Sequence, residues 1–507
     1  MTLLLGIDIG TSSAKAVLYH AETAYLVAVA GQEYPVLTPA PGAAEQVPDE
    51  WWQAVVRVVR DVTARAGTSS TIAGIGLSGQ MHSTVLLDKG HTPIQPAIIW
   101  ADQRSGAASV ELAARVGAER FAAIGGTLPA AGFMASTLYW LRSQHPALLD
   151  NTRHILLPKD YVRLRLTGDV ATDLSDAAST ALFDISRKDW SAELIAAVGV
   201  SADLLPPVRA STAVAGSLLS SAASELGLAP GIPVVTGCAD QPAQAIACGL
   251  LAPGTASVTT GSGGQVFVPL QPPASSSVPT DARLHVFNHA EPDMYYVLGA
   301  ILSAGLALRW LRRIANLEGR ADAYTHLSAA AAAVPPGADG LLFLPYLLGE
   351  RTPHMDSLVR GSFIGLSYQH DLGYLARAVM EGVAFALRQA LEISQSLTGS
   401  LQGLIGSGGG MESQIWRQIQ TDVFGLPLRK TLVVEQAAVG AALLAGVGAG
   451  IFNSLSEACE HAVRLDQPTE PIPENHRLYN ERYEQFCQLY PLLRPVFHRH
   501  GHALDAP

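Results

Sequence analysis

A carboxylate inside an apolar run near the N-terminus is the feature that most limits how this chain can fold. Asp8 lies between Ile7 and Ile9, and a turn of small residues, 10–13, separates this run from a second one, 14–18. Burying an ionised carboxylate without a partner is costly, so hydrogen-bond donors or a metal ion must meet Asp8. The pattern predicts a β-hairpin whose turn brings backbone amides close to phosphate oxygens. A purely structural hairpin with a hydrogen-bonded aspartate is the alternative.

A similar pattern recurs near the middle of the chain. The segment 257–264 reads SVTTGSGG and lies between two further apolar runs, with Gly261, Ser262 and Gly263 at its turn. One such turn is common in hairpins, but two amide-lined turns that face each other can clasp a triphosphate. The repetition predicts two related halves joined near residues 250–254, where Pro-Gly marks a loop.

Short apolar runs alternate with amphipathic patterns throughout, which predicts an α/β protein. The 507 residues exceed one ordinary core, so we expect two domains, 1–250 and 251–507. The expected strands cover 7–9, 14–18, 72–77, 85–87, 258, 266–268, 295–298 and 340–344. The expected helices cover 52–65, 129–144, 377–397 and 416–424.

Composition narrows the class of protein. Hydrophobic residues make up 48% and charged residues 15%, which is globular, and the net charge of −11 disfavours a nucleic-acid partner. The densest basic cluster, Arg309, Arg312 and Arg313, is interpreted as a solvated helix end. No pair of the four cysteines has the C-x-x-C spacing of a zinc site. The N-terminus resembles a strand and not a signal peptide, and the Ala- and Gly-rich stretch 437–452 predicts a tightly packed buried helix. We therefore expect a soluble cytoplasmic protein with no membrane partner.

A second acidic residue ends a predicted strand. The run 232–239 is followed by Asp240, and Gln241-Pro242 then opens a helical pattern. Aspartate before a proline in the first turn is typical of a helix N-cap, where the helix dipole favours the ionised carboxylate. Such a carboxylate beside a cleft is suited to act as a general base. A plain capping aspartate is the alternative.

Glycine-rich patterns indicate which kind of nucleotide site the chain could form: one pattern supports such a site, and two known nucleotide-binding motifs are not supported. Residues 406–410, GSGGG, lie between a predicted strand and a helix, where glycines can lie against a flat ligand or phosphate. No G-x-x-x-x-G-K-[ST] sequence occurs, so a P-loop is not supported. Gly74, Gly76 and Gly79 have G-x-G-x-x-G spacing, but a strand follows them instead of a helix, which argues against a dinucleotide-binding dehydrogenase.

An ordered set of motifs over roughly residues 3–450 resembles the FGGY carbohydrate kinases, and within them the xylulokinases. The matching segments are GIDIGTSSAKAVL, GLSGQMHSTVLLD, AIIWADQR, LLPKDYVRLRLTGDVATDLSDAASTALFDISRKDWS, FLPYLLGERTPHMD, LARAVMEGVAFALR, GSGGGMESQIWRQIQTDVFGLPL and EQAAVGAALLAG. The resemblance implies two actin-like ATPase (ribonuclease H-like) domains with ATP and a sugar in an interdomain cleft. It implies transfer of a phosphoryl group from Mg-ATP to D-xylulose, giving D-xylulose 5-phosphate, and a possible homodimer. A kinase for another ketose or polyol, a chaperone-like ATPase and a catalytically silent sugar-binding module are the alternatives.

The resemblance also implies residue roles. Asp240 is the expected general base, and Asp8 is expected to position Mg²⁺ through water. The first domain, 1–250, would hold the sugar site, and 251–507 would hold most of the nucleotide site. Expected sugar contacts are Met81, His82, Trp100, Asp240 and Gln241, the last standing where some xylulokinases carry Asn. Expected nucleotide contacts are Thr11, Ser12, Gly261, Ser262, Gly263, Gly408, Gly409 and Gly410.

Overall fold

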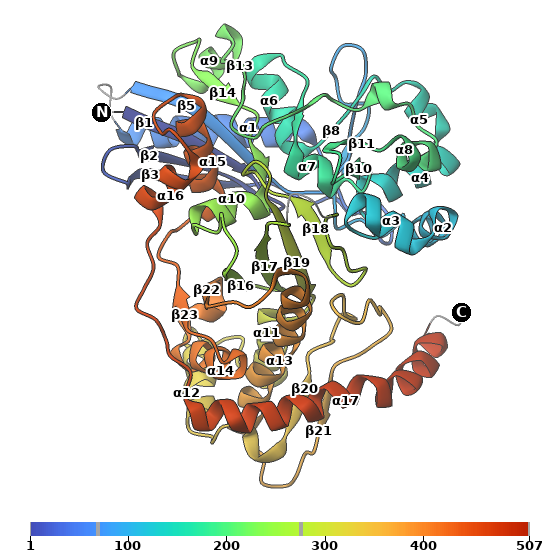
Figure 1. The fold of residues 1–507 in the computed structure, drawn as a ribbon, viewed down its shortest axis with the longest axis vertical. Helices are drawn as coiled ribbons and strands as arrows, with labels where there is room; N and C mark the ends of the chain where they lie inside the picture. The colour runs from blue at the N-terminus through green and yellow to red at the C-terminus, as the bar shows by residue number, and fades with distance from the viewer. Residues whose placement is uncertain (1, 67–70, 273–276, 505–507) are drawn as a thin grey trace. The chain divides into compact units, whose positions relative to one another are not determined.

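The computed structural model describes residues 2–66, 71–272 and 277–504, and these residues form two compact units. The first unit consists of Met1–Leu251, Gln271–Tyr296 and Val433–Arg464. The second consists of Ala252–Leu270, Val297–Leu432 and Leu465–Pro507. Two segments from the second half of the sequence therefore pack with the first unit. The expected α/β class is confirmed, since each unit combines β-sheet with helices (Figure 1).

A mixed sheet organises the first unit. The strand order is β13-β14-β5-β1-β2-β3, and a short strand, β15, also pairs with β5. Their bounds are β1 Thr2–Ile9, β2 Ser13–His20, β3 Tyr25–Glu33, β5 Thr71–Gly79, β13 Val214–Ser217, β14 Pro233–Val235 and β15 Cys238–Ala239. Strands β1 and β2 are antiparallel neighbours, so the predicted N-terminal hairpin is confirmed. Strands β14, β15 and β1 all run parallel to β5.

Alternation along β1 assigns its residues to two cores on opposite faces of the sheet. Leu3, Leu5 and Ile7 belong to one buried cluster together with the apolar side of α1 (Pro48–Ala66). Leu4 belongs to a second cluster that contains α15 (Gln436–Gly448) and α10 (Asp240–Ala247). Helix α15 comes late in the chain, yet it lies against the early strands of this unit (Figure 1).

Glycine lets α15 approach the sheet closely. A Cβ atom on Gly6 would collide with the carbonyl of Ala438, and one on Gly76 would collide with that of Ala441. On the other side of the helix, Gly440 abuts the carbonyl of Ala243 in α10. The expected tightly packed Ala- and Gly-rich helix is confirmed, and the G-x-G spacing in β5 serves helix packing. Since α10 begins at Asp240, this packing also fixes the position of that residue.

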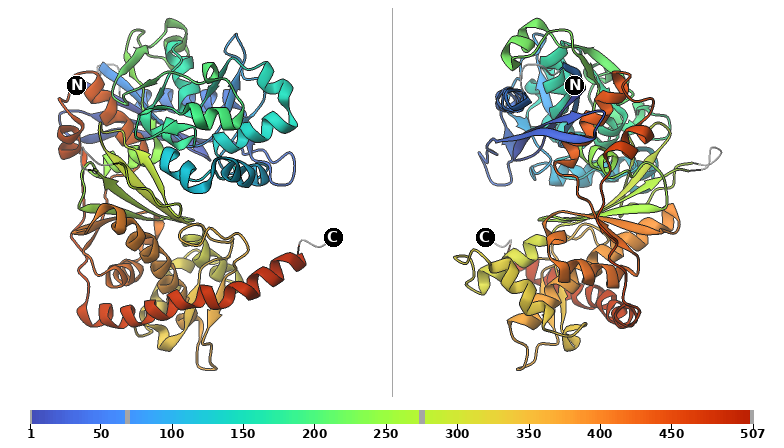
Figure 2. Two further views of the ribbon diagram at one scale, coloured as in Figure 1. Left: turned by 45° about the vertical axis from the view of Figure 1, so that its right-hand side comes forward. Right: turned by 90° about the vertical axis from the view of Figure 1, so that its left-hand side faces the viewer.

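The second unit is built around another sheet. Its strand order is β18-β19-β17-β16-β22-β23, and the edge strand β18 belongs to the segment Gln271–Tyr296 that is grouped with the first unit. The bounds are β16 Thr255–Thr260, β17 Gly264–Leu270, β18 His285–Asn288, β19 Tyr295–Ile301, β22 Gly403–Ser407 and β23 Leu428–Lys430. Strands β16 and β17 form the second predicted hairpin, and β22 runs parallel to β16. The long helix α17 (Pro473–Leu504) contacts α13 (Leu372–Thr398) and α14 (Gln414–Phe424), and it is the red rod in Figure 2.

The remaining elements connect these layers. The other helices are α2 Gly106–Val116, α3 Ala118–Gly125, α4 Met134–Gln144, α5 Pro146–Asp150, α6 Pro158–Thr167, α7 Leu174–Ser179, α8 Ala192–Val198, α9 Ser220–Leu226, α11 Gly305–Ile314, α12 Ala323–Ala332 and α16 Leu455–Ala462. The other strands are β4 Glu45–Gln46, β6 Val85–Leu87, β7 Ala97–Ile98, β8 His154–Leu156, β9 Thr172–Asp173, β10 Phe183–Asp184, β11 Asp189–Trp190, β12 Val208–Arg209, β20 Leu342–Leu344 and β21 Ser362–Ile364. The helix expected from residue 129 starts only at Met134, because Phe133 is still extended. No helix in the described part of the chain has the length and apolarity needed to cross a bilayer.

Candidate active site

Three parallel strands of the first unit end at the same edge of the sheet. Asp8 in β1, Ser78 in β5 and Cys238 in β15 are neighbours in register. Carboxyl ends of adjacent parallel strands are a common place for ligand sites, since the chain leaves the sheet there with exposed backbone groups. The register brings Asp8 close to Asp240, which directly follows β15. The two predicted carboxylates thus lie in one site although they are far apart in the sequence.

Asp8 is a buried carboxyl that lacks full hydrogen bonding. Burial raises its pKa from 3.8 to about 6, although the Ser78 hydroxyl and the positive charge of Lys15 act in the opposite direction. Among the described residues, Oδ1 of Asp8 has no hydrogen-bond partner. Lys15 forms an ion pair with Glu435, in which Nζ and Oε2 are 2.6 Å apart. Asp8 therefore retains an oxygen able to accept a ligand from outside the protein.

Asp240 is the first residue of α10, which corrects the predicted N-cap. Ala239 occupies the cap position, and because alanine has no side-chain oxygen the helix has no side-chain cap. Burial first, and then the negative charge of Asp8, raise the pKa of Asp240 from 3.8 to about 7, against hydrogen bonds from Gln241. Oδ1 of Asp240 lacks a hydrogen-bond partner in the described part of the chain. This carboxyl group can take up a proton near neutral pH.

The turn after β1 is held by side chains from three directions. The Tyr34 hydroxyl donates to the carbonyl of Gly10. Gln46 Nε2 donates to the Thr11 carbonyl at 2.7 Å, and Trp100 Nε1 donates to the Thr11 hydroxyl at 2.9 Å. These bonds fix the turn, in which the N–H of Gly10 already donates to the carbonyl of Ser13 at 3.1 Å. Trp100, expected at the sugar, is therefore also a support of the predicted phosphate turn.

A glutamine pair extends this support to the end of β5. Gln80 Nε2 donates to Gln46 Oε1 at 2.8 Å, and the backbone N–H of Gln80 donates to the carbonyl of Ile9 at 2.9 Å. Ser12, at the tip of the turn, is exposed, and its carbonyl accepts a bond from the N–H of Tyr34 at 3.2 Å. The hydroxyl of Ser12 is thus accessible to solvent and to a ligand.

Met81 and His82 form the next part of the site. Met81 is buried, whereas His82 is half-buried and has a left-handed backbone conformation, with φ at 68°. His82 Nδ1 lies 2.7 Å from the carbonyl of Ser179, so this nitrogen carries a proton and donates it. The imidazole stacks on Phe133, with ring centroids 3.8 Å apart and an interplanar angle of 6°. These contacts fix the orientation of the imidazole, and a strained backbone held this firmly is typical of functional positions.

The second unit contains a separate pocket of about 990 Å³. Four residues predicted to contact nucleotide line it: Gly261, Ser262, Gly409 and Gly410. The turn at Gly261 is tied to the start of α11, because the N–H of Gly305 donates to the Gly261 carbonyl at 2.8 Å. The pocket is also lined by apolar and aromatic side chains, among them Leu308 and Tyr324. Its size and mixed lining suit a ligand with a flat ring and a polar tail.

Of the nucleotide residues predicted in the second unit, Gly263 and Gly408 do not line this pocket. Gly408 has φ at 85°, and a Cβ there would collide with the carbonyl of Thr260. Gly263 lies against the carbonyl of Ile301. Both glycines therefore permit close backbone packing beneath the pocket. Arg309 had been interpreted only as part of a solvated helix end, but it also lines the pocket and donates to the Ser262 hydroxyl at 3.3 Å.

In the first unit, Asp8 offers one carboxylate to a cation, which is not a full set of protein ligands. Within residues 2–66, 71–272 and 277–504, no group of three or more His, Cys, Asp or Glu side chains could hold a metal ion. The orphaned Oδ1 of Asp8 fits a Mg²⁺ ion that keeps most of its ligands as water and phosphate oxygens. The water-mediated role expected for Asp8 stays a prediction.

Several residues of the site were not predicted from the sequence. Tyr34, Gln46 and Phe133 reach the site only through tertiary contacts. Ser78 carried a usable signal, because the residue opposite Asp8 on a neighbouring parallel strand must face the same side of the sheet. Ser179 carried no signal, since it meets His82 through tertiary contacts, above all through its backbone carbonyl.

Known proteins are similar to this chain over nearly its whole length. Residues 3–247 match the N-terminal domain, and residues 256–449 the C-terminal domain, of the FGGY family of carbohydrate kinases. The xylulose kinase of Bacillus subtilis (strain 168) is 34% identical over 491 residues, covering 97% of each chain. The gluconokinase of the same strain is 29% identical over 499 residues, covering 97% of this chain and 96% of its own. The crystal structure of xylulose kinase from Rhodospirillum rubrum has a TM-score of 0.91 and 32% identity, and the match covers 98% of this chain and all of that one.

Proposed function

The chain belongs to the FGGY family of carbohydrate kinases and is an ATP-dependent sugar kinase, and from that premise we propose that its substrate is D-xylulose. The product is D-xylulose 5-phosphate, and Mg-ATP is the phosphoryl donor. The observation that carries the mechanism is that Asp8 and Asp240 lie at the ends of β1 and β15, the two parallel strands that flank β5. A chaperone-like ATPase or a silent sugar-binding module fits less well, since similarity to sugar kinases extends over nearly the whole chain.

In this proposal Asp240 is the general base. The terminal hydroxyl oxygen of the sugar attacks the γ-phosphorus, the bond from that phosphorus to the ADP oxygen breaks, and the hydroxyl proton passes to Asp240. A pKa of about 7 suits a base at neutral pH, because a useful fraction is ionised while its proton affinity is still high. Mg²⁺, held near Asp8 through water, supplies neutralisation of the triphosphate charge when bound.

The sugar contacts follow from the groups around Asp240. Met81 supplies an apolar wall against carbon, and the fixed imidazole of His82 supplies a hydrogen-bonding edge without a permanent charge. Gln241 supplies both a donor and an acceptor beside the reacting end. Trp100 is assigned to the rim of the sugar site. A ketose with several hydroxyls can satisfy these neutral polar groups together, and a sugar that lacks one leaves a buried partner unpaired.

The pocket of the second unit is assigned to the nucleotide. Its apolar lining at Leu308 and Tyr324 suits the adenine ring, and Gly409 and Gly410 permit a flat ligand to lie close to the backbone. Backbone amides around Gly261 and the Ser262 hydroxyl are then available to the phosphates, and Thr11 and Ser12 supply the corresponding donors of the first unit. Gly263 and Gly408 contribute indirectly, by allowing the backbone to pack as it does beneath this site.

The competing function is phosphorylation of another ketose or polyol. This alternative remains in consideration because a gluconokinase, which is named for a different substrate, is 29% identical to this chain over nearly its whole length. The deciding experiment measures kcat/KM for ATP-dependent phosphorylation of D-xylulose, D-ribulose, L-xylulose, D-fructose, D-gluconate and glycerol. We expect the highest value for D-xylulose. A clearly higher value for any other compound would refute the proposed specificity while leaving the kinase activity in place.

A further inference from the structure

We infer that helix α7 is a positioning element for the reaction, in which Ser175 holds the backbone that carries Asp240 while Ser179 holds His82. The inference rests on the proposed function, because it takes Asp240 as the base and His82 as a sugar contact. Neither serine is expected to touch a substrate. Both act through the residue that they hold, and the short helix between them connects the reacting end of the site to its sugar-binding part.

The Ser175 hydroxyl accepts one hydrogen bond and donates another, and the bond that it accepts comes from the strand before Asp240. The backbone N–H of Ala239 donates to the Ser175 hydroxyl at 3.0 Å, although the two residues lie 64 positions apart. The same hydroxyl donates its own proton to Asp173 Oδ2 at 2.6 Å, so its direction is fixed. Ser175 is completely buried, and no water competes for these bonds. The residue directly before Asp240 is therefore held in one position by an oriented acceptor.

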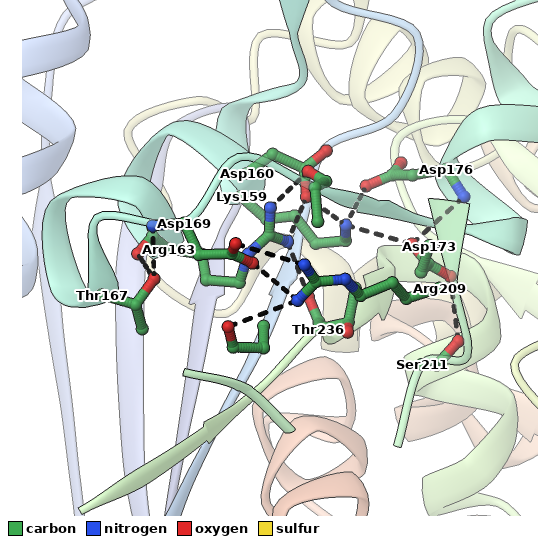
Figure 3. Close-up of polar contacts among 12 residues, drawn as sticks. Lys159, Asp160, Arg163, Thr167, Asp169, Asp173, Asp176, Arg209, Ser211 and Thr236 are labelled. Carbon is green, nitrogen blue, oxygen red and sulfur yellow. Dashed lines mark hydrogen bonds and ion pairs between the residues drawn. The ribbon is translucent and has the colours of Figure 1, made fainter. Parts of the chain in front are cut away.

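A buried ionic cluster anchors the helix itself. Asp173 caps α7 by accepting the N–H of Ser175 at 2.9 Å, and its other oxygen lies 3.0 Å from Lys159 Nζ. Figure 3 shows this ammonium group among three carboxylates, with Asp160 at 2.7 Å and Asp176 at 3.1 Å. Burial alone would lower the pKa of Lys159, but the negative charges beside it, first that of Asp160 and then that of Asp173, outweigh burial and raise it. The ammonium group therefore stays charged and fixes the start of α7.

The cluster also reaches the strand of Asp240 by a second route. Arg163 donates to the carbonyl of Thr236 at 3.1 Å and pairs with Asp160 at 2.7 Å (Figure 3). Thr236 precedes β15, so the segment that leads to Asp240 is held at two places, by Arg163 and by Ser175. Side chains that bind the backbone at both ends of a short strand restrict its movement, and even a small displacement of a reacting group lowers the rate.

The other end of α7 contacts the sugar-binding part of the site. The carbonyl of Ser179 accepts the proton of His82 Nδ1 at 2.7 Å, and the Ser179 hydroxyl accepts the backbone N–H of His82 at 3.3 Å. The first bond fixes the tautomer, which leaves Nε2 as the acceptor of the neutral imidazole. One helix of 6 residues thus sets both the position of the base and the hydrogen-bonding character of the imidazole.

Stability alone does not account for this arrangement. Buried ion pairs often stabilise a fold no more than apolar residues of similar volume would, because removing the charges from water is costly. The bonds that leave this cluster run to the residue before Asp240, to the strand leading to it and, through α7, to His82. A structural role predicts loss of stability on mutation, whereas a positioning role predicts changes in specific kinetic constants.

The test compares single substitutions in the full chain, with the sugar that gives the highest kcat/KM. Ser175→Ala is expected to lower kcat roughly 5- to 50-fold, with little change in the KM of the sugar, because the base is displaced by a fraction of an ångström. Its kcat–pH profile is expected to shift to lower pH, since a loosened Asp240 is better hydrated. Ser179→Ala removes the hydroxyl that accepts the backbone N–H of His82 but keeps the carbonyl that fixes the imidazole, so it is expected to raise the KM of the sugar at most several-fold and to change kcat less.

Ser211→Ala is the matched control, because the Ser211 hydroxyl also donates to Asp173 Oδ2, at 2.9 Å, but makes no bond to Ala239. If Ser175→Ala and Ser211→Ala have the same kcat and the same pH profile, the positioning role of Ser175 is wrong. If Ser175→Ala does not fold, Ser175→Cys of nearly equal size replaces it with the same expectations. Asp240→Ala is measured alongside: if it retains wild-type turnover, the proposed base has failed, which is distinct from failure at Ser175 alone.

Discussion

Asp240→Asn separates the chemistry of the proposed base from its shape. The amide keeps the size of the carboxyl but cannot accept the hydroxyl proton at neutral pH. Loss of a general base typically lowers kcat ~10²–10⁴-fold, which corresponds to ~3–5 kcal/mol of barrier. In the wild type, kcat should rise with pH through about 7, where the raised pKa of Asp240 places its ionisation. The substituted enzyme should lose this rise along with its activity.

The same substitution should increase stability at high pH. The folded-state pKa of Asp240 lies above its usual value, so the folded protein holds this proton more tightly than the unfolded chain does. The resulting stabilisation is complete below pH 3.8 and is lost as pH rises through about 7. At higher pH the ionised, partly buried carboxyl is unfavourable by at most ~4 kcal/mol, and we expect roughly 1–2 kcal/mol after allowing for its partial exposure. Asp240→Asn removes this unfavourable contribution.

Thermal unfolding at several pH values between 5 and 8.5, together with steady-state kinetics, measures both effects. The unfolding temperature of the variant relative to the wild type should increase with pH by roughly 2–8 °C over this range. Asp203→Asn, at an exposed aspartate of the same unit, is the control and should show no such trend. If the variant keeps more than a tenth of wild-type kcat, or if its relative stability does not change with pH, the account of Asp240 is wrong.

Two further predictions concern the surrounding structure. Burial first, and then the nearby aspartates, hold the pKa of Asp176 well above its usual range, so Asp176→Asn should change the free energy of unfolding by less than ~1 kcal/mol. Asp173→Asn weakens the pairing of Lys159 and should lower the free energy of unfolding by ~3–5 kcal/mol, as measured by denaturant titration. Equal losses in both variants would contradict this. Arg309→Ala should raise the KM of ATP roughly 3- to 10-fold with kcat little changed, because Arg309 lines the nucleotide pocket. Arg313→Ala, on the same helix but outside the pocket, is the control and should leave both constants unaltered. An unchanged KM for ATP in Arg309→Ala would argue against the nucleotide assignment.

Local patterns were enough to predict the elements that carry the site. Both hairpins, the strand before Asp240 and the helices α13 and α14 follow from apolar periodicity and from runs of Gly, Ser and Thr. Asp8 was found because a charged residue in a buried strand requires an explanation. These features depend on neighbours within a few residues, which is the range over which side-chain chemistry constrains the backbone.

The contacts that support the site could not be predicted in this way. Ser175 meets Ala239 across 64 residues, and α15 joins the sheet of the first unit from the far end of the chain. Nothing in the local sequence distinguishes Ser175 from other serines near a helix start. The N-cap error has a similar origin: a strand that ends in Cys-Ala-Asp and a helix that begins at Asp have the same local sequence, and only the backbone conformation of Ala239 decides between them.

The two carboxyls are thus placed where they are electrostatically unfavourable, and the rest of the unit holds them there. Burial raises the pKa of both Asp8 and Asp240, and Asp8 is close enough for its charge to raise the pKa of Asp240 as well. The opposing contribution comes from packing remote from the charge, above all from α15, which lies against Gly76 of the sheet and Ala243 of α10. A substitution that relieves the carboxyl pair should therefore increase stability and abolish turnover, whereas one that separates α15 from the sheet should reduce both. The opposite signs of these stability changes distinguish residues that react from residues that hold them in place.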